Sequence, residues 1–529
     1  MSFTTLEFLL FLLAGLIVYY ILPKKYQWIW LLIISYGYYF SFSRKTAVFL
    51  VYTTIVVYAG GILLDTFNAR SKAYLADNKE TLDREQKKAY KANVKKKKRQ
   101  VVVAMLILAF GMLGAVKYLN FIIENIDALV LAVGHGQYIE PMAVILPLGI
   151  SFYTFQSVSY IIDIYQGKYA AERNLFKFAL FVSFFPQLLQ GPIGRFDRLA
   201  HQLYEGRRFE LGNLQYGAQR ICWGLFKKVV LADRTAGLVN NVFTNYGEYG
   251  GFYNIVAVLM YSVQLYADFS GGVDIVIGTA QMFGIQMDEN FRQPYFSKSI
   301  GEFWRRWHIT LGAWMKDYIF YPFSLSKCMN RFGKWCKKHL PAGIAKTLPI
   351  GLANILIFFI VGIWHGAAWK YIMYGLYNGF IIAASSMLEP VYHWGLEKCH
   401  INAKSRPWQI FQIIRTFILV NIGWFFDMAV GLSAALVMMK ETFTKMSLSQ
   451  LTDGSIFTLG MTQGDFIIVF VGCLIVFIIS LLKEKGICIR DAIASKPVVV
   501  RWACYYSLIL LVIFLGYTAS ASGFIYANF

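Results

Sequence analysis

Long apolar runs recur along the whole chain and restrict what it can fold into. A transmembrane helix needs about 20 predominantly apolar residues, and most of these runs reach or approach that length. Only 15% of the 529 residues are charged, too few to cover a water-facing surface, since soluble domains carry about 25%. We therefore predict an all-α polytopic membrane protein of about twelve hydrophobic segments. These are residues 5–22, 26–43, 46–64, 101–123, 141–164, 176–193, 214–232, 253–284, 347–388, 409–430, 463–482 and 503–521.

A basic segment predicts the orientation of these spans. Residues 70–99 contain 12 Lys and Arg against 4 Asp and Glu. Cytoplasmic loops hold the excess of Lys and Arg, so we expect residues 66–100 to form a cytoplasmic loop. Its charge is a topology signal or a contact with anionic membrane lipids, and we predict no binding of nucleic acid. Counting spans from this loop places the N-terminus and the C-terminus outside the cell, with the first run retained as a span rather than cleaved.

Several common chemistries lack their motifs in this sequence. The seven cysteines are scattered and show no CxxC spacing, so we predict neither a disulfide framework nor a metal site. The GxxxxGK[ST], GxGxxG, HExxH and GxSxG motifs are absent as well. ATP-driven transport, nicotinamide redox chemistry, zincin proteolysis and serine hydrolysis of the α/β type are therefore unsupported.

The hydrophobic pattern between residues 141 and 385 is repeatedly interrupted by Gly, Pro and ionisable residues. Irregular backbone at membrane depth survives where protein or a water-filled cavity satisfies its polar groups, so we expect a central polar cavity. Within this region His365 lies in an otherwise apolar run, 351–380. An ionisable side chain there is a functional candidate, and a neutral imidazole can accept a proton from a hydroxyl. The alternative is a structural histidine that joins two helices.

Two acidic residues, Asp268 and Asp274, flank the pair Gly271-Gly272, where we expect a helix break. They could orient an imidazole, bind a cation, or cap the ends of broken helices. The segment 289–322 mixes aromatic residues with cations, as interfacial or re-entrant helices do. Membrane anchoring explains much of that composition. Its cations Arg305, Arg306 and Lys316 could also bind the phosphates of an anionic donor, and His308 is a second catalytic candidate.

Five blocks of sequence carry a resemblance to a known family. The most specific parts are WRRWHI, which contains His308, and WHGAAW, which contains His365. With these blocks the chain resembles bacterial members of the membrane-bound O-acyltransferase family, in the branch that O-acetylates alginate and peptidoglycan, related to the proteins that transfer D-alanine to teichoic acid. The pair Gly272-Val273 departs from the pattern expected after Gly271. The matching blocks are residues 146–167, 184–196, 266–285, 290–322 and 362–379.

The resemblance implies a helical bundle with re-entrant segments around a central funnel. It implies that His365 and His308 are catalytic, with Trp364, Asp268 and Asp274 supporting or orienting them. The donor would be a cytoplasmic thioester, acetyl-CoA or an acylated carrier protein, used as a substrate with no bound cofactor. The implied division is N-terminal spans over 1–140, a catalytic core over 141–390, and C-terminal spans over 391–529.

The last residues, GFIYANF, resemble the C-terminal motif of the small membrane partner in teichoic acid D-alanylation, where a tyrosine is thought to carry the acyl group. This resemblance implies that Tyr526 is an acyl carrier and that Phe524 and Phe529 dock the tail. The alternative is an aromatic residue at the membrane interface.

The resemblance implies transfer of an acyl group, most simply acetyl, across the bacterial cytoplasmic membrane for O-acetylation of a cell-surface polysaccharide or peptidoglycan. D-alanyl transfer to teichoic acid is the nearest variant. The outer loops are too short to finish the reaction, so the family pattern implies a separate extracytoplasmic partner, an SGNH-hydrolase-like acyltransferase. The alternative from another class is a transporter or flippase, since broken helices with midplane Asp residues also describe those proteins.

Overall fold

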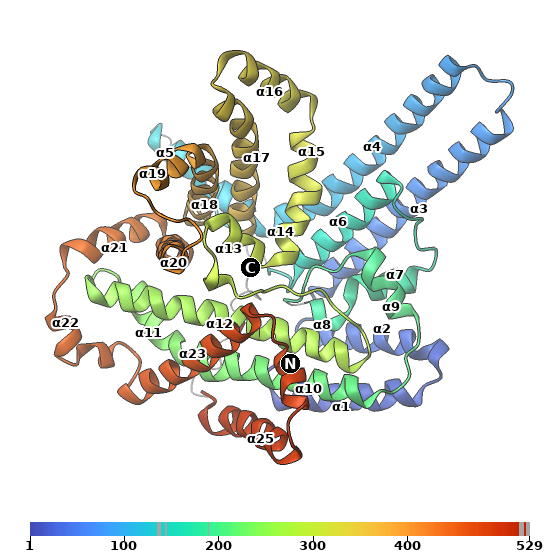
Figure 1. Ribbon diagram of the computed structural model, residues 1–529. Coiled ribbons are helices and arrows are strands. Elements are labelled where there is room, and N and C mark those ends of the chain that lie inside the picture. Colours follow the sequence, from blue (N-terminus) through green and yellow to red (C-terminus); the bar gives the residue numbers. More distant parts are fainter. Residues whose placement is uncertain (135–138, 143–144, 189, 518–522, 525–529) are drawn as a thin grey trace. The chain divides into compact units, whose positions relative to one another are not determined.

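A computed structural model describes residues 1–134, 139–142, 145–188, 190–517 and 523–524 (Figure 1). Its regular structure over these residues is helical, and the β-type pairing found there is an isolated antiparallel bridge between Phe291 and Trp307. The described chain divides into two compact units. These observations confirm the predicted all-α class.

The first unit comprises residues 1–215 together with 279–287. Aromatic side chains fill its interior; the Tyr19 ring, for example, packs edge-on against Phe283 with ring centroids 5.1 Å apart. The end of a long helix from the middle of the chain is tied to the first helix, because the Tyr20 hydroxyl donates to the Met282 carbonyl at 2.7 Å. The helices of this unit are α1 (Leu6–Ile21), α2 (Lys24–Phe40), α3 (Ala47–Asp77), α4 (Arg84–Lys117), α5 (Leu119–Ala132), α6 (Ile150–Gln166), α7 (Leu175–Ser183), α8 (Phe185–Leu188) and α9 (Phe196–Tyr204).

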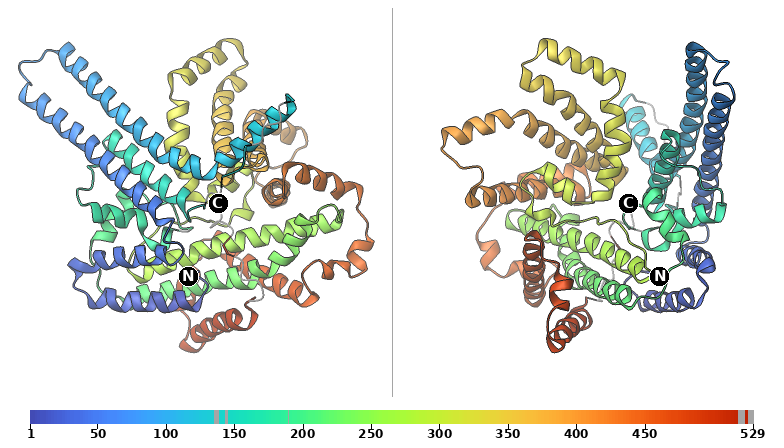
Figure 2. Two further views of the ribbon diagram at one scale, coloured as in Figure 1. Left: turned by 180° about the vertical axis from the view of Figure 1, so that it is seen from behind. Right: turned by 45° about the vertical axis from the view of Figure 1, so that its right-hand side comes forward.

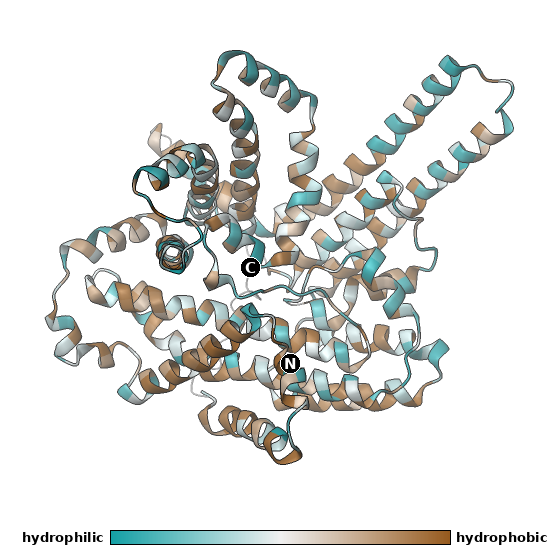
Figure 3. Ribbon diagram, viewed as in Figure 1, coloured by the Kyte–Doolittle hydropathy of each residue, from teal (hydrophilic) through white to brown (hydrophobic). Residues whose placement is uncertain are grey.

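The basic segment expected as a loop is helical over most of its length. Helices α3 and α4 form a long hairpin whose connecting turn is short (Figures 1 and 2). The Asp83 side chain accepts from the Gln86 backbone N–H and the Gln86 side chain accepts from Asp83 N–H, a capping box that fixes the start of α4. Hydrophilic residues cover the outer ends of this hairpin and hydrophobic residues its inner half (Figure 3). The charge therefore lies on two helices that extend past their apolar portions.

The second unit comprises residues 216–278 and the described chain from 288 onward. Its elements are α10 (Leu211–Leu225, which begins in the first unit), the π-helix η1 (Phe226–Ala232), α11 (Asp233–Thr244), α12 (Phe252–Met282, which ends in the first unit), the 3₁₀ helix η2 (Pro294–Phe296), α13 (Ile300–Arg306), α14 (Ile309–Met315), the π-helix η3 (Lys316–Phe320), α15 (Tyr321–Ser324), α16 (Lys327–His339), α17 (Ala342–His365), α18 (Trp369–Met387), α19 (Glu389–Lys398), α20 (Arg406–Met428), α21 (Leu432–Thr444), α22 (Ser449–Thr452), the 3₁₀ helix η4 (Ser455–Thr458), α23 (Gln463–Glu484), α24 (Ile489–Ala494) and α25 (Val498–Leu515).

Six of the described helices are long and apolar enough to cross a membrane: α3, α4, α17, α20, α23 and α25. This number is smaller than the twelve hydrophobic segments read from the sequence. Some predicted segments form shorter helices, such as the 16 residues of α1, and 176–193 is divided between α7 and α8. The segment 347–388 forms two helices, α17 and α18. Six candidate spans support a multi-pass membrane protein.

The expected helix break at Gly271-Gly272 is wrong, because α12 continues through both residues. These glycines allow two helices to approach closely. A Cβ atom at Gly271 would lie 2.8 Å from the Gly224 carbonyl oxygen, and a Cβ at Gly224 would lie 2.5 Å from the Gly271 carbonyl oxygen. Small residues serve this purpose at many membrane helix contacts. The glycine pair therefore sets the spacing between α10 and α12, and Asp268 and Asp274 do not cap helix ends.

Candidate active site

His365 is the last residue of α17, and glycines fix where that end of the helix lies. A Cβ at Gly362 would lie 2.4 Å from the Tyr371 carbonyl oxygen, and a Cβ at Gly375 would lie 2.1 Å from the Phe358 carbonyl oxygen. The backbones of α17 and α18 are therefore as close as glycine permits. This packing holds the His365 imidazole inside the second unit, with 2% of its surface exposed.

Asp427 faces the His365 ring from helix α20. Its Oδ1 atom lies 3.4 Å from His365 Nδ1, and its Oδ2 accepts a hydrogen bond from the Tyr261 hydroxyl at 2.6 Å. The Lys370 ammonium donates to the Asp427 backbone carbonyl at 3.0 Å and to the Ala429 carbonyl at 2.7 Å. The carboxylate is thus fixed by contacts to its side chain and to its backbone. This arrangement matches the way carboxylates orient catalytic imidazoles.

His308 lies between the short helices α13 and α14 in a left-handed backbone conformation, with φ of 47°. Non-glycine residues adopt this region at a cost and persist there when their surroundings hold them. Asn290 supplies that support, because its Oδ1 accepts from the Thr310 N–H at 3.0 Å and the Thr310 hydroxyl at 2.9 Å. The same oxygen lies 3.2 Å from His308 Nδ1. Since Oδ1 is an acceptor, Nδ1 donates, and the neutral ring keeps its lone pair on Nε2.

The two histidines predicted as catalytic meet at one indole ring. The centroid of the Trp364 ring is 5.2 Å from that of His365 and 5.7 Å from that of His308. The Phe269 ring contacts His308 edge-on, with centroids 4.8 Å apart. His308 lies outside the six long apolar helices, and burial, with the nearby His365 imidazole, lowers its pKa below the ordinary histidine value. His308 is therefore neutral at physiological pH.

Asp268 forms an ion pair with a lysine on the π-helix η1. Lys228 Nζ lies 2.6 Å from Asp268 Oδ1 and 2.8 Å from Asp233 Oδ1, and all three side chains are buried. Such charges are tolerated inside a protein because they are paired and hydrogen-bonded. Phe269, the residue after Asp268, is the one that contacts the His308 ring. Asp268 therefore fixes a turn of α12 that borders the candidate site.

Asp274 belongs to a second network of charged side chains, which includes residues of η1 and α10. Lys227 Nζ lies 2.6 Å from Asp274 Oδ2, and Arg220 Nε donates to Asp274 Oδ1 at 2.9 Å. Arg220 also makes two hydrogen bonds to the Glu289 carboxylate, at 2.6 and 2.7 Å. Glu289 is next to Asn290, which supports His308. This network links α10 and α12 to the loop that positions the second histidine.

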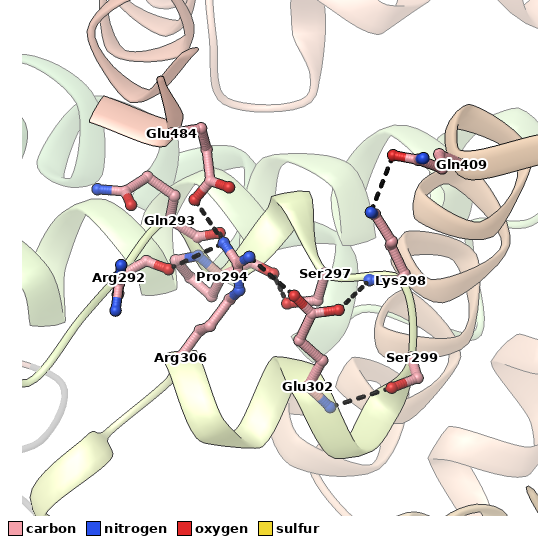
Figure 4. Close-up of polar contacts among 10 residues, drawn as sticks. All are labelled: Arg292, Gln293, Pro294, Ser297, Lys298, Ser299, Glu302, Arg306, Gln409 and Glu484. Carbon is pink, nitrogen blue, oxygen red and sulfur yellow. Dashed lines mark hydrogen bonds and ion pairs between the residues drawn. The ribbon is translucent and has the colours of Figure 1, made fainter. Parts of the chain in front are cut away.

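Arg306, a candidate for donor binding, has many protein partners (Figure 4). Its guanidinium is paired with Glu302 on its own helix, at 2.8 Å, and with Glu484 at the end of α23. It also donates to the Gln293 backbone carbonyl at 3.4 Å. Glu302 in turn accepts from the Lys298 backbone N–H at 2.9 Å. Arg306 thereby ties the 292–299 turn to α13 and α23.

Arg305 and Lys316, the other two candidate donor-binding cations, have exposed side chains. The Lys316 ammonium lies over the Tyr321 ring, 5.6 Å from its centroid. Of the three candidate donor-binding residues, Arg305 and Lys316 are therefore accessible to a ligand, whereas Arg306 is partly buried.

The C-terminal tail is described at Gly523 and Phe524, whereas Tyr526 and Phe529 lie outside the described residues. Phe524 is buried, with 4% of its surface exposed. The Lys228 ammonium lies 4.8 Å from the centroid of the Phe524 ring and 3.5 Å from the Gly523 carbonyl oxygen. The same lysine that pairs with Asp268 thus contacts the tail.

Sequence reasoning did not name Asp427, Asn290 or Lys228. Asp427 could have been found, since it is an ionisable residue at the end of the apolar run 409–430. Nothing local distinguishes Asn290 from other loop asparagines. Among the described residues, no group of three or more His, Cys, Asp and Glu side chains is placed to hold a metal ion.

Comparisons with known proteins show the family to which the chain is similar. A family model described as the membrane-bound O-acyltransferase family matches residues 170–334. The chain is 39% identical over 319 residues to a probable alginate O-acetylase of Pseudomonas syringae pv. tomato, a match that covers 60% of this chain and 56% of that protein. It is 32% identical over 445 residues to a probable alginate O-acetylase of Pseudomonas aeruginosa, covering 84% of this chain and 75% of that protein.

A third relative acts on another polymer. The chain is 32% identical over 370 residues to the peptidoglycan O-acetyltransferase of Helicobacter pylori, and the match covers 65% of this chain and 64% of that protein. The matches thus span a little over half to three quarters of these relatives' lengths. The chain belongs to the membrane-bound O-acyltransferase family, which confirms both the family and the enzyme class predicted from its motifs.

Proposed function

We propose that this protein transfers an acetyl group from acetyl-CoA on the cytoplasmic side of the bacterial cell membrane toward an O-acetylated polymer of the cell surface. The observation that carries the proposal is the His365–Asp427 pair, in which a buried carboxylate lies 3.4 Å from the imidazole Nδ1. Relatives named as O-acetylases of alginate and peptidoglycan support the choice of acetyl over D-alanyl as the transferred group.

In the proposed reaction His365 acts as a general base. The Asp427 carboxylate, with Oδ1 3.4 Å from Nδ1, favours the tautomer that carries its proton on Nδ1. The lone pair of the neutral ring then lies on Nε2, which takes the proton of an acceptor hydroxyl. The hydroxyl oxygen attacks the thioester carbonyl carbon, and the C–S bond breaks as the ester C–O bond forms. The CoA thiolate leaves and takes the proton from the His365 imidazolium, which restores the neutral ring. Base catalysis of this type contributes about 10² to 10⁴-fold.

His308 has a different proposed role. Its ring is neutral and its Nδ1 donates to Asn290, while the indole of Trp364 contacts both His308 and His365. A neutral imidazole that is held so rigidly is suited to orienting the acyl donor or the acceptor rather than to carrying charge. Exposed Arg305 and Lys316 are the proposed contacts for the phosphates of CoA.

Tyr526 is the proposed first acceptor of the acetyl group. The buried Phe524 ring and its contact with Lys228 support a docked tail, because a fixed Phe524 restricts where the residue two positions later can reach. From the tyrosyl ester the acetyl group passes to a separate extracytoplasmic acyltransferase of the SGNH-hydrolase type, which completes transfer to the polymer. This route needs the C-terminus outside the cell, and the charge of the loops favours the same side for the N-terminus.

The decisive experiment uses purified full-length protein and acetyl-CoA. We expect release of free CoA and a mass increase of one acetyl group on the C-terminal peptide, both lost in His365→Ala and in Tyr526→Phe, because Tyr526 supplies the hydroxyl that attacks the thioester. An unmodified tail beside His365-dependent CoA release would remove the relay and keep the acyltransferase. Flux of a substrate across vesicles with no release of CoA would instead support a transporter.

A further inference from the structure

A basic pocket lies between three helices of the first unit, α3, α4 and α6. Its volume is about 470 Å³, within the range of small-ligand sites. Four lysines contribute to its lining, Lys72 from α3 and Lys91, Lys95 and Lys98 from α4, and the lining contains no Asp or Glu. Tyr165 and Gln166, at the end of α6, close one side. The pocket is therefore a concave site with strong positive charge.

Of the four lysines, Lys98 is bound by the protein itself, and the other three are exposed and can bind an external partner. The half-buried Lys98 ammonium donates to the Tyr165 carbonyl at 3.1 Å and lies over the Tyr165 ring, 5.2 Å from its centroid. Lys72, Lys91 and Lys95 are exposed. Ammonium groups that converge on one cavity repel each other, and an anion in the cavity removes that cost. A phosphate group, with several acceptor oxygens, suits such a site.

The position of the pocket along α4 indicates where the phosphate comes from. The apolar part of α4 begins at Val101, three residues after Lys98 and so about 4.5 Å farther along the helix axis. Lys98 and Lys95, about 4.5 and 9 Å before Val101 along the helix axis, lie at or near the depth of lipid headgroups, and Lys91, about 15 Å before it, lies on the aqueous side of that layer. Tyr165 beside them is a residue type enriched at that interface. A soluble ligand would have to reach this depth, whereas headgroup phosphates are already there.

We propose that this pocket binds the headgroup phosphate of an anionic phospholipid in the leaflet on the basic, cytoplasmic side. Lys72, Lys91 and Lys95 contact the phosphate, and Lys98 forms the wall of the site through Tyr165. The site is separate from the proposed acyl-transfer chemistry and does not depend on it. Basic pockets between membrane helices on the cytoplasmic side are suited to this kind of recognition.

The test compares two triple variants that lose the same charge from the same hairpin. The pocket variant is Lys72→Gln, Lys91→Gln and Lys95→Gln; the control variant is Lys88→Gln, Lys96→Gln and Lys97→Gln, exposed residues that do not line the pocket. Full-length protein in detergent is titrated with dioleoylphosphatidylglycerol or dioleoylphosphatidylcholine, and bound lipid is counted by native mass spectrometry. We expect saturable binding of phosphatidylglycerol that weakens at least about tenfold in the pocket variant and less than about threefold in the control.

Three results would overturn the proposal. Equal weakening in both triple variants would mean diffuse attraction by the hairpin and no pocket site. Displacement of phosphatidylglycerol by added CoA, lost in the pocket variant, would mean that the site takes the phosphates of a soluble donor and not those of a lipid. Phosphatidylcholine bound as tightly as phosphatidylglycerol would also contradict an anion site.

Discussion

The Nδ1 atom of His365 lies 3.4 Å from Oδ1 of Asp427, and the two residues come from different helices, α17 and α20. The second carboxylate oxygen of Asp427 is occupied by the Tyr261 hydroxyl. The carboxylate therefore has a fixed orientation, and it favours the imidazole tautomer that carries its proton on Nδ1. The lone pair then lies on Nε2, the nitrogen that can act as the base.

Asp427→Asn should keep the fold and lose most of the catalysis. An amide has nearly the same shape as the carboxylate, but it can present its NH₂ group to Nδ1 and so favour the wrong tautomer. We expect kcat for CoA release to fall about 100-fold or more, with KM for acetyl-CoA little changed. Tyr261→Phe is the control, since it keeps the carboxylate and removes one of its hydrogen bonds, and it should cost about tenfold or less. Full activity in Asp427→Asn would show that the pair is structural.

Two substitutions of His308 separate a catalytic role from a structural one. Asn tolerates the left-handed conformation of this position better than Ala does, so His308→Asn should fold more stably than His308→Ala, by about 1 kcal/mol. If the imidazole acts in the reaction, both variants should lose activity by more than about tenfold. Thermal unfolding and CoA release measured on the same samples provide the comparison. An active Asn variant beside an unstable Ala variant would make His308 a residue of the backbone turn only.

The sequence singles out His365, because an ionisable residue inside an apolar run is energetically costly, and it singles out His308 through its motif. The catalytic role of both histidines stays a prediction. The sequence predicts their surroundings less well. Asp427 is 62 positions away from His365, and no local pattern shows that α17 and α20 place these side chains together. Lys228 lies within the hydrophobic run 214–232. The mean hydropathy of that run does not show that Lys228 has buried ion-pair partners, Asp268 and Asp233, outside it.

The continuity of α12 was also hidden from local reasoning. Glycine in a helix costs about 1 kcal/mol relative to alanine, so two in succession predict a break. Here the contact with Gly224 offsets that cost, because it places two helix backbones side by side. The packing of α12 against α10 therefore outweighs the low helix propensity of the two glycines.

Gly271→Ala should destabilise the protein, since its Cβ would lie 2.8 Å from the Gly224 carbonyl oxygen and one helix would have to move. Overpacking of this kind costs about 1 to 3 kcal/mol. Gly111→Ala in α4 is the matched control, because a Cβ there meets nothing within 4 Å. That substitution should leave stability unchanged or raise it by up to about 1 kcal/mol. Thermal unfolding in detergent measures both, and a Gly271→Ala variant as stable as the parent would contradict the close contact.

Arg305→Ala and Arg306→Ala test which cation binds the acyl donor. Arg306 is partly buried and holds Glu302, Glu484 and a backbone carbonyl, so its loss leaves two carboxylates without their cation. Hydrogen bonds to charged groups contribute about 1.5 to 3 kcal/mol, and Arg306→Ala should lower the unfolding temperature. Arg305 is exposed, and its removal should leave that temperature unchanged while raising KM for acetyl-CoA, by about tenfold if it contacts a CoA phosphate.

The informative result is that one variant changes the unfolding temperature and the other changes KM for acetyl-CoA. Because neighbouring positions on one short helix carry the same charge, a general electrostatic effect on the donor would raise KM equally in both variants. A rise in KM confined to Arg306→Ala, at unchanged unfolding temperature, would show that the guanidinium leaves its protein partners to bind the donor. The contacts with Glu302 and Glu484 would then mark a resting arrangement of this side chain, and Arg305 would lose its proposed role.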